Sequence, residues 1–315
     1  PPSGYAQFAF SAEGTLAYIP ASVLNAERML VWVDRTGTEQ PVIETPRLYS
    51  DPRLSPDGQR LALTIQQESR DVWVYELARG TLTRLTFREA AEFRPIWTPD
   101  GARVIYQSEQ PQYDLYWRRA DGSAPEAPLL SSEYDKRPSS ISPDGKVLAF
   151  TEINPDTGED IWLLPLDGEG EPKPFLDTPF GEEFAAFSPD GRWLAYQSHE
   201  SGRDEVYVTA YPDPAGGRWQ VSADGGVEPL WSRSGKELFY RNGNKLMAVQ
   251  IDMASGLAGT PTLLFEGPYF TQGYDLAPDN QRFLMVKTPP ESAPRQVNVV
   301  LNWFEELKRL VPPGK

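Results

Sequence analysis

The chain has 315 residues, and its 31 prolines and 12% aromatic content are typical of many short strands joined by turns. A formal net charge of −15 argues against nucleic acid as a partner, because phosphates require a basic surface. The absence of cysteine excludes disulfides and thiol chemistry, and no apolar run is long enough to predict a membrane span.

One phrase recurs along the chain: a bulky apolar residue, a four-residue turn that mostly ends in Gly, and then an apolar alternation. In Ser55-Pro56-Asp57-Gly58, Pro presets φ, Asp can accept a bond from the backbone ahead, and Gly accepts positive φ. The steps between the seven turns are 44, 43, 44, 46, 44 and 45 residues, which is the length of a four-stranded propeller blade. The turns begin at Ser11, Ser55, Thr98, Ser142, Ser188, Ser232 and Ala277.

Each repeat predicts strand, turn, strand and then a third strand that starts with an acidic residue. Asp71, Asp114 and Asp160 hold this position, with an aromatic residue two places on. Because they occupy equivalent places in separate repeats, we expect them to bond local backbone amides rather than a ligand.

The predicted fold is all-β: a single closed β-propeller over residues 1–315, built from four-stranded antiparallel blades. We expect seven blades, the last irregular, with six as the alternative. The predicted blades span about 8–45, 50–87, 93–130, 137–177, 183–222, 227–266 and 272–301. A short helix over 302–311 is expected to pack against the last blade, because Trp303, Leu307 and Leu310 share one face.

The Ser-Pro-Asp-Gly phrase, followed by an apolar strand and then Asp-aliphatic-aromatic, resembles the TolB-like or WD-type propeller repeats of bacterial proteins over residues 8–287. The tail from Gln296 to Leu307 is similar to the end of propeller regions that follow bacterial serine/threonine kinase domains, although this chain has no kinase motif. The resemblance implies a sensor or accessory module attached to a kinase domain in a longer protein, or a stand-alone relative. It also implies a periplasmic or extracytoplasmic location.

In such a fold the first strand of each blade lines the central channel. We therefore expect binding at the face formed by the loops that lead into these strands, where Asp51 and Arg53 also lie, and by the loops between second and third strands. Arg residues suit carboxylates there, and aromatic faces suit apolar or sugar groups. The candidate ligand-binding residues are Glu92, Phe93, Arg94, Asp135, Arg137, Glu183, Phe184, Glu228, Tyr274, His199 and Arg203.

No catalytic residue is predicted. His199 is the only histidine, and no Gly-x-Ser-x-Gly elbow occurs; one His and no Cys exclude a zinc site. The leading hypothesis is thus a non-catalytic module that binds a protein or a small polar ligand without a cofactor. The alternative is a calcium-dependent ester or lactone hydrolase with the ion in the channel. Its carboxylates would come from Asp51, Glu92, Asp135, Glu183, Glu228 and Asp275.

Overall fold

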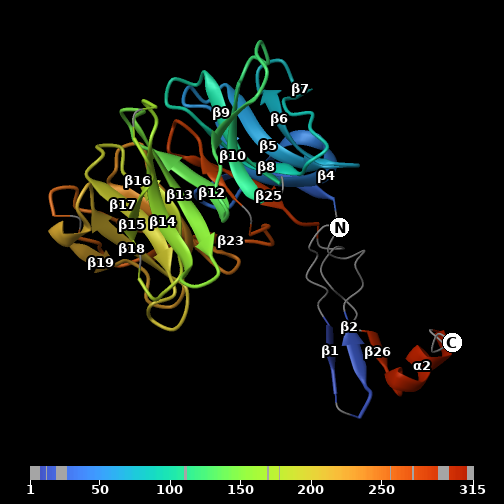
Figure 1. Ribbon diagram of the computed structural model, residues 1–315. Coiled ribbons are helices and arrows are strands. Elements are labelled where there is room, and N and C mark those ends of the chain that lie inside the picture. Colours follow the sequence, from blue (N-terminus) through green and yellow to red (C-terminus); the bar gives the residue numbers. More distant parts are fainter. Residues whose placement is uncertain are drawn as a thin grey trace.

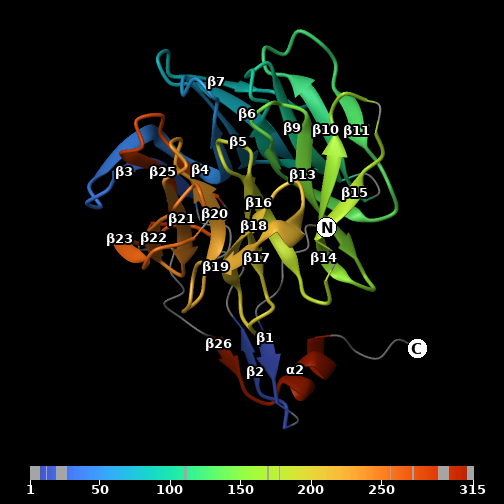
Figure 2. The same cartoon turned by 90° about the vertical axis from the view of Figure 1, so that its left-hand side faces the viewer.

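The structure, a computed structural model, describes residues 8–11, 13–18, 27–109, 112–168, 170–176, 178–255, 257–271, 273–289 and 298–310. Its strands pair antiparallel throughout and form separate sheets that are arranged around a common centre (Figures 1 and 2).

Four of these sheets have four strands each, taken in chain order, and we call them blades 2 to 5. Blade 2 comprises β8 (Glu92–Trp97), β9 (Arg103–Glu109), β10 (Tyr113–Arg119) and β11 (Ala127–Leu130). Blade 3 comprises β12 (Asp135–Ile141), β13 (Val147–Asn154), β14 (Gly158–Pro165) and β15 (Lys173–Leu176). Blade 4 comprises β16 (Glu182–Phe187), β17 (Trp193–Ser198), β18 (Glu205–Ala210) and β19 (Arg218–Gln220), with the 3-10 turn η1 (Pro214–Gly216) before β19. Blade 5 comprises β20 (Val227–Trp231), β21 (Glu237–Asn242), β22 (Lys245–Gln250) and β23 (Thr262–Glu266).

A seven-stranded sheet supplies two further blades that share one long strand, β4 (Glu39–Leu54). The first part of β4 pairs with β3, whereas its last seven residues, from Leu48, pair with β5. Blade 1 is the end of β4 with β5 (Arg60–Gln66), β6 (Arg70–Glu76) and β7 (Thr81–Arg84). Blade 6 is β24 (Asp275–Leu276), β25 (Arg282–Lys287), β3 (Arg28–Asp34) and the start of β4.

Apolar clusters close the six blades into a ring. Each of the six clusters of buried side chains in the described residues joins two consecutive blades. Phe239 of blade 5 packs edge-on against Phe283 of blade 6 at 4.9 Å between ring centroids, and Leu284 of blade 6 shares a cluster with Leu61 of blade 1. The core therefore lies between blades, and the pairing corresponds to the six-blade alternative.

The first and last predicted blades are corrected by this pairing. Strands β1 (Phe8–Phe10) and β2 (Leu16–Tyr18) pair with each other and with β26 (Asn298–Val300), not with residues 28–45. Residues 28–45 instead supply the outer strands of the blade that β24 and β25 begin. The turn at Ser11 does form, since Gly14 N–H donates to Ser11 O at 3.1 Å, but a turn motif does not determine which distant strand its neighbours join.

The C-terminal helix is confirmed as α2 (Trp303–Leu310), and Val311 lies outside the described residues. Its expected packing against the last blade is wrong. Trp303 N–H donates to Gly14 O at 2.6 Å, so the helix is attached to the β1–β2 turn. Both views show this small sheet and α2 standing apart from the ring (Figures 1 and 2).

The repeated turn has the predicted chemistry. Gly58, at φ 69°, donates to Ser55 O at 2.7 Å, and the Asp57 carboxylate accepts the Gln59 N–H at 3.0 Å. These turns also join neighbouring blades, because Gly58 lies directly against the ring of Pro278 in the turn of blade 6. The third-strand acids are structural as expected, but they bond mainly side chains: Asp71 accepts from Ser69 at 2.6 Å and from Arg84 at 2.7 Å.

Candidate functional site

An irregularity recurs in the first strand of the blades, three residues before the bulky residue that precedes the turn. The pairing register shifts there in β4, β8, β12, β16 and β20, as at a β-bulge. Left-handed φ occurs at this position in five of the six blades, at 51°, 55°, 55°, 55° and 88°. In blade order these residues are Asp51, Arg94, Phe184, Glu228 and Gly273, with Pro138 at the equivalent place in blade 3.

This conformation is costly for side chains other than Gly, at about 1 kcal/mol or more per residue. A bulge redirects a side chain, and here it directs one position per blade toward the centre of the ring. Four non-glycine residues are held in this conformation by the surrounding sheets, which identifies the ring of bulges as a candidate functional feature.

The bulge residues line a cavity of about 270 Å³ to which the first strands of blades 1 to 5 and the residues just before β24 contribute. Its volume is near the lower end for small-molecule sites and suits a small ligand or one end of a longer one. The polar lining includes three guanidinium groups, three carboxylates, one phenol and the hydroxyls of Ser139, Ser140 and Thr151; the apolar lining includes Ile96, Trp97, Leu230 and Phe184. The guanidinium, carboxylate and phenol groups belong to Arg53, Arg94, Arg137, Asp51, Glu183, Glu228 and Tyr274.

Two of the three guanidinium groups are bonded to the protein. Arg137 forms an ion pair with Glu183 across the interface between blades 3 and 4. Arg53 donates to the carbonyls of Tyr274, at 2.9 Å, and Pro52, at 3.1 Å. Arg94 differs: its guanidinium carbon lies 5.7 Å from the centroid of the Phe184 ring, and no hydrogen bond or ion pair to Arg94 is present within the described ranges.

Burial changes the acidity of several lining groups. Desolvation lowers the pKa of Arg94, and the nearby carboxylates, Asp51 first, oppose this shift. Desolvation raises the pKa of Glu183, and Arg137 opposes that shift. Desolvation also raises the pKa of Glu228 to about 7 against the effect of Arg241. The Oε2 atom of Glu228 is buried and has no hydrogen-bond partner in the described part of the chain. Below neutral pH the Glu228 carboxyl is therefore protonated and can donate a hydrogen bond.

The structure brings six of the predicted site residues to the cavity and leaves five elsewhere. Arg94, Arg137, Glu183, Phe184, Glu228 and Tyr274 line it. Glu92 is fully buried outside the cavity lining, where burial raises its pKa to about 7. Phe93 contacts Tyr113 edge-on at 5.5 Å, and Asp135 accepts the Tyr113 N–H at 3.0 Å.

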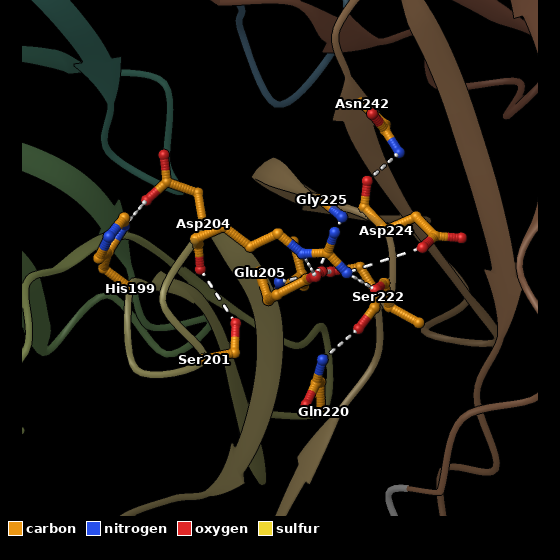
Figure 3. A network of polar contacts seen from close by, with 12 residues as sticks. His199, Ser201, Asp204, Glu205, Gln220, Ser222, Asp224, Gly225 and Asn242 are labelled. Carbon is orange, nitrogen blue, oxygen red and sulfur yellow. Dashed lines mark hydrogen bonds and ion pairs between the residues drawn. The ribbon is translucent and has the colours of Figure 1, made fainter.

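His199 belongs to a different network, on the loops beside β18 (Figure 3), and Arg203 is part of the same loop region. His199 Nδ1 lies 3.2 Å from Asp204 and the imidazole is exposed, while Ser201 Oγ donates to the Arg203 carbonyl. Arg203 pairs at 2.7 Å with Glu205, which also accepts the Gly225 N–H at 3.0 Å. The network links the loop before β18 to the loop before β20, which is a structural role.

Sequence reasoning placed Asp51 and Arg53 on the correct loops but left them out of the candidate set. The signal that would have selected Asp51 is the fixed distance to the bulky residue before each turn, since the residue three before it lies at the register shift in blades 1 to 5; that signal does not select Arg53. No group of three or more His, Cys, Asp or Glu residues that could hold a metal ion occurs in the ranges the structure describes.

Comparison with known proteins agrees with this architecture. The profile of the TolB β-propeller domain family matches residues 8–171, just over half of the chain. The chain belongs to this family. Membership establishes the propeller module, and the match covers β1 and β2 of the small sheet, blades 1 and 2, and the first three strands of blade 3.

Solved structures share the fold at low identity. A protein assigned as TolB in Agrobacterium tumefaciens is 21% identical, with a TM-score of 0.66 over 84% of this chain and 99% of that one. TolB of Acinetobacter baumannii is 16% identical, with a TM-score of 0.56 over 93% and 80% of the two chains. A puromycin-hydrolysing peptidase of Mycobacterium tuberculosis is 16% identical, with a TM-score of 0.54 over 84% of this chain and 45% of that one.

A curated relative, named as the uncharacterized peptidase YuxL of Bacillus subtilis, is 28% identical over 104 residues. The match covers 30% of this chain and 16% of the relative, so the chain spans only a small part of its length. In the described ranges, no helix has the length and apolar character needed to cross a membrane.

Proposed function

We propose that this propeller is a binding module without catalytic turnover, and that a peptide segment or a small polar ligand enters the central cavity. The observation that carries the proposal is the ring of bulges: five blades hold an equivalent residue at left-handed φ, which is strained in the four that are not glycine, and all five line one cavity. Strain repeated around a central cavity is consistent with selection for binding rather than for stability.

The charge pattern of the cavity supports a polar ligand. Guanidinium groups and carboxylates from different blades face a space that is also lined by Phe184 and Ile96, which suits a ligand with both polar and apolar parts. We further propose that the module acts outside the cytoplasmic membrane, as an accessory or sensor part of a larger assembly or of a longer protein that could include a kinase domain. The proposal includes no metal ion.

Peptide selection tests the proposal. A randomised peptide library is panned against the full chain, and the enriched peptides are titrated by fluorescence anisotropy against the unaltered protein and two variants. Ser139→Trp fills the cavity from β12, whereas Ser201→Trp adds the same ring to an exposed loop far along the chain. We expect Ser139→Trp to weaken binding by at least about tenfold and Ser201→Trp to leave it unchanged.

Mass spectrometry of the recovered peptides checks that no turnover occurs. Peptides that bind equally well to the Ser139→Trp variant would place recognition outside the cavity and overturn the proposal, and cleaved peptides would overturn its non-catalytic part. Circular dichroism of both variants shows whether the ring stays folded.

A further inference from the structure

The three guanidinium groups of the cavity are not equivalent. The Arg137 side chain is neutralised by Glu183, and Arg53 is bonded to two backbone carbonyls. Both are thus part of the wall. Arg94 is the remaining cation, and in the described residues no acceptor meets its five N–H groups.

The surroundings of Arg94 make this arrangement costly in the free protein. Burial lowers its pKa although the nearby Asp51 carboxylate raises it, and in the described residues no ion pair or hydrogen bond replaces the hydration that the charged form has lost. The bulge at Arg94, with φ 55°, adds backbone strain at the same residue. A ligand that brings an acceptor to this guanidinium would recover the lost interactions, whereas a purely apolar ligand would not.

The charge of the cavity limits which acceptor fits. Asp51, Glu183 and Glu228 line the same space and repel a group with two negative charges. A carboxylate carries one charge, and its planar pair of oxygens matches the fork of N–H groups on Arg. Phe184, Leu230 and Ile96 offer apolar surface for the carbon skeleton that bears it.

We propose that Arg94 is the anchor of a carboxylate subsite, at which the ligand presents a single carboxylate to the guanidinium and lays its carbon skeleton against Phe184. This inference deepens the proposed function and rests on it. The carboxylate could belong to a peptide C-terminus, an acidic side chain or a small organic acid, and the chemistry at Arg94 is the same for all three.

Arginine side-chain NMR tests the subsite in the unaltered protein. The full chain is labelled with ¹⁵N-arginine, and the Nε–H signal of Arg94 is assigned by its loss in Arg94→Lys. Sodium acetate, acetamide and sodium phosphate are then titrated at constant ionic strength. Acetamide is the neutral counterpart of acetate, and phosphate is the dianionic competitor.

We expect acetate to shift the Arg94 signal in a saturable manner, acetamide to leave it in place, and phosphate to bind at least about tenfold more weakly than acetate. No saturable shift with acetate, or equal shifts with acetamide, would overturn the subsite. Tighter binding of phosphate than of acetate would overturn its selectivity for a single charge.

The peptides selected against the cavity separate this result from the proposed function. Each is compared with its C-terminally amidated form and with a form in which Asp and Glu are replaced by Asn and Gln. Loss of binding on amidation identifies the C-terminus as the source of the carboxylate, and loss on replacement identifies a side chain. If neither change weakens binding while Ser139→Trp still does, the cavity is a binding site but the carboxylate subsite is wrong.

Discussion

Arg137 and Glu183, which lie 46 residues apart in the chain, form an ion pair that joins the first strands of blades 3 and 4 at the wall of the cavity. The Glu183 carboxylate is paired with Arg137, although it also attracts Arg94 electrostatically, after the larger effect of Asp51. Of these two guanidinium groups, Arg94 is the one without an ion pair in the described residues.

Removal of Arg137 should allow the Glu183 carboxylate to occupy the carboxylate subsite at Arg94. In Arg137→Met the Glu183 carboxylate is free to turn to Arg94, so we expect acetate to bind at least about tenfold more weakly because an intramolecular competitor has a high effective concentration. The double variant Arg137→Met/Glu183→Gln lacks that competitor and should recover the affinity. NMR titration of the Arg94 signal measures both, and equal weakening in the single and double variants would contradict this explanation.

Acetate binding should also weaken as pH rises through about 7. The Glu228 pKa of about 7 means that this carboxyl is neutral and can donate to a bound carboxylate at pH 6, but is ionised and repels it at pH 8. Arg241, Arg53, Arg94 and Tyr274 surround it. We expect about a tenfold loss of affinity from pH 6 to pH 8.

The matched variant for this pH dependence is Glu228→Gln, whose amide donates at every pH. Its affinity for acetate should vary less than about twofold between pH 6 and pH 8. If the variant loses affinity as steeply as the unaltered protein, another group titrates and the assignment to Glu228 fails.

The stability of the ring should decrease between pH 5 and pH 8. Burial raises the pKa values of Glu92 and Glu182 to about 7, above the ordinary 4.5, so the folded state favours their neutral forms. This stabilisation is complete below the unfolded pKa and is lost as pH rises through the folded pKa. Chemical unfolding at a series of pH values measures it.

Glutamine variants isolate the two carboxyls. Glu92→Gln and Glu182→Gln should each raise the free energy of unfolding at pH 8, by at most about 3 kcal/mol, and have much less effect at pH 5. The exposed Glu133→Gln serves as the control and should change stability at neither pH. Destabilisation of both buried variants at pH 8 would mean that the ionised carboxylates make favourable contacts instead.

A pair of glycine variants tests how the ring closes. Gly58 and Gly145 occupy the same turn position, with φ of 69° and 76°. A substitution by Ala at either position should lower the free energy of unfolding by about 1 kcal/mol through backbone strain. At residue 58 the added Cβ would lie 2.2 Å from Cγ of Pro278, whereas at residue 145 the nearest atom is 4.0 Å away. We expect Gly58→Ala to cost about 2 kcal/mol more than Gly145→Ala, as measured by thermal unfolding; equal costs would argue against close packing of blades 6 and 1.

The repeated turn and the strand alternation were predictable because both depend on neighbouring residues. Asp57 bonds the backbone two residues ahead, and Gly58 adopts positive φ, as the local sequence requires. Ser11 begins a similar turn, and the period alone made its surroundings look like a blade. The partner of those strands is β26, almost 300 residues away, and no local pattern encodes that choice.

For the site, the positions of the residues along the chain were predictable, but their backbone conformation was not. Arg94, Phe184 and Glu228 could be placed at the channel because each precedes a turn by a fixed distance. Their left-handed φ could not be predicted, since Arg, Phe and Glu do not favour it and only the sheet around them imposes it. His199 was predicted from the position of its loop alone, and its side chain lies beside Asp204, outside the lining of the cavity.

The sharing of blade 6 between the two ends of the chain affects how the protein is made. Strands β3 and the first part of β4 are synthesised before blades 1 to 5, whereas β24 and β25 are synthesised after them. Until then the buried faces of Val31 and Val33 lack their partners in β25, and blades 1 and 5 are not joined through a complete blade 6. A nascent chain can therefore build an arc of sheets, but it completes the circle, and with it the cavity, only when β24 and β25 emerge.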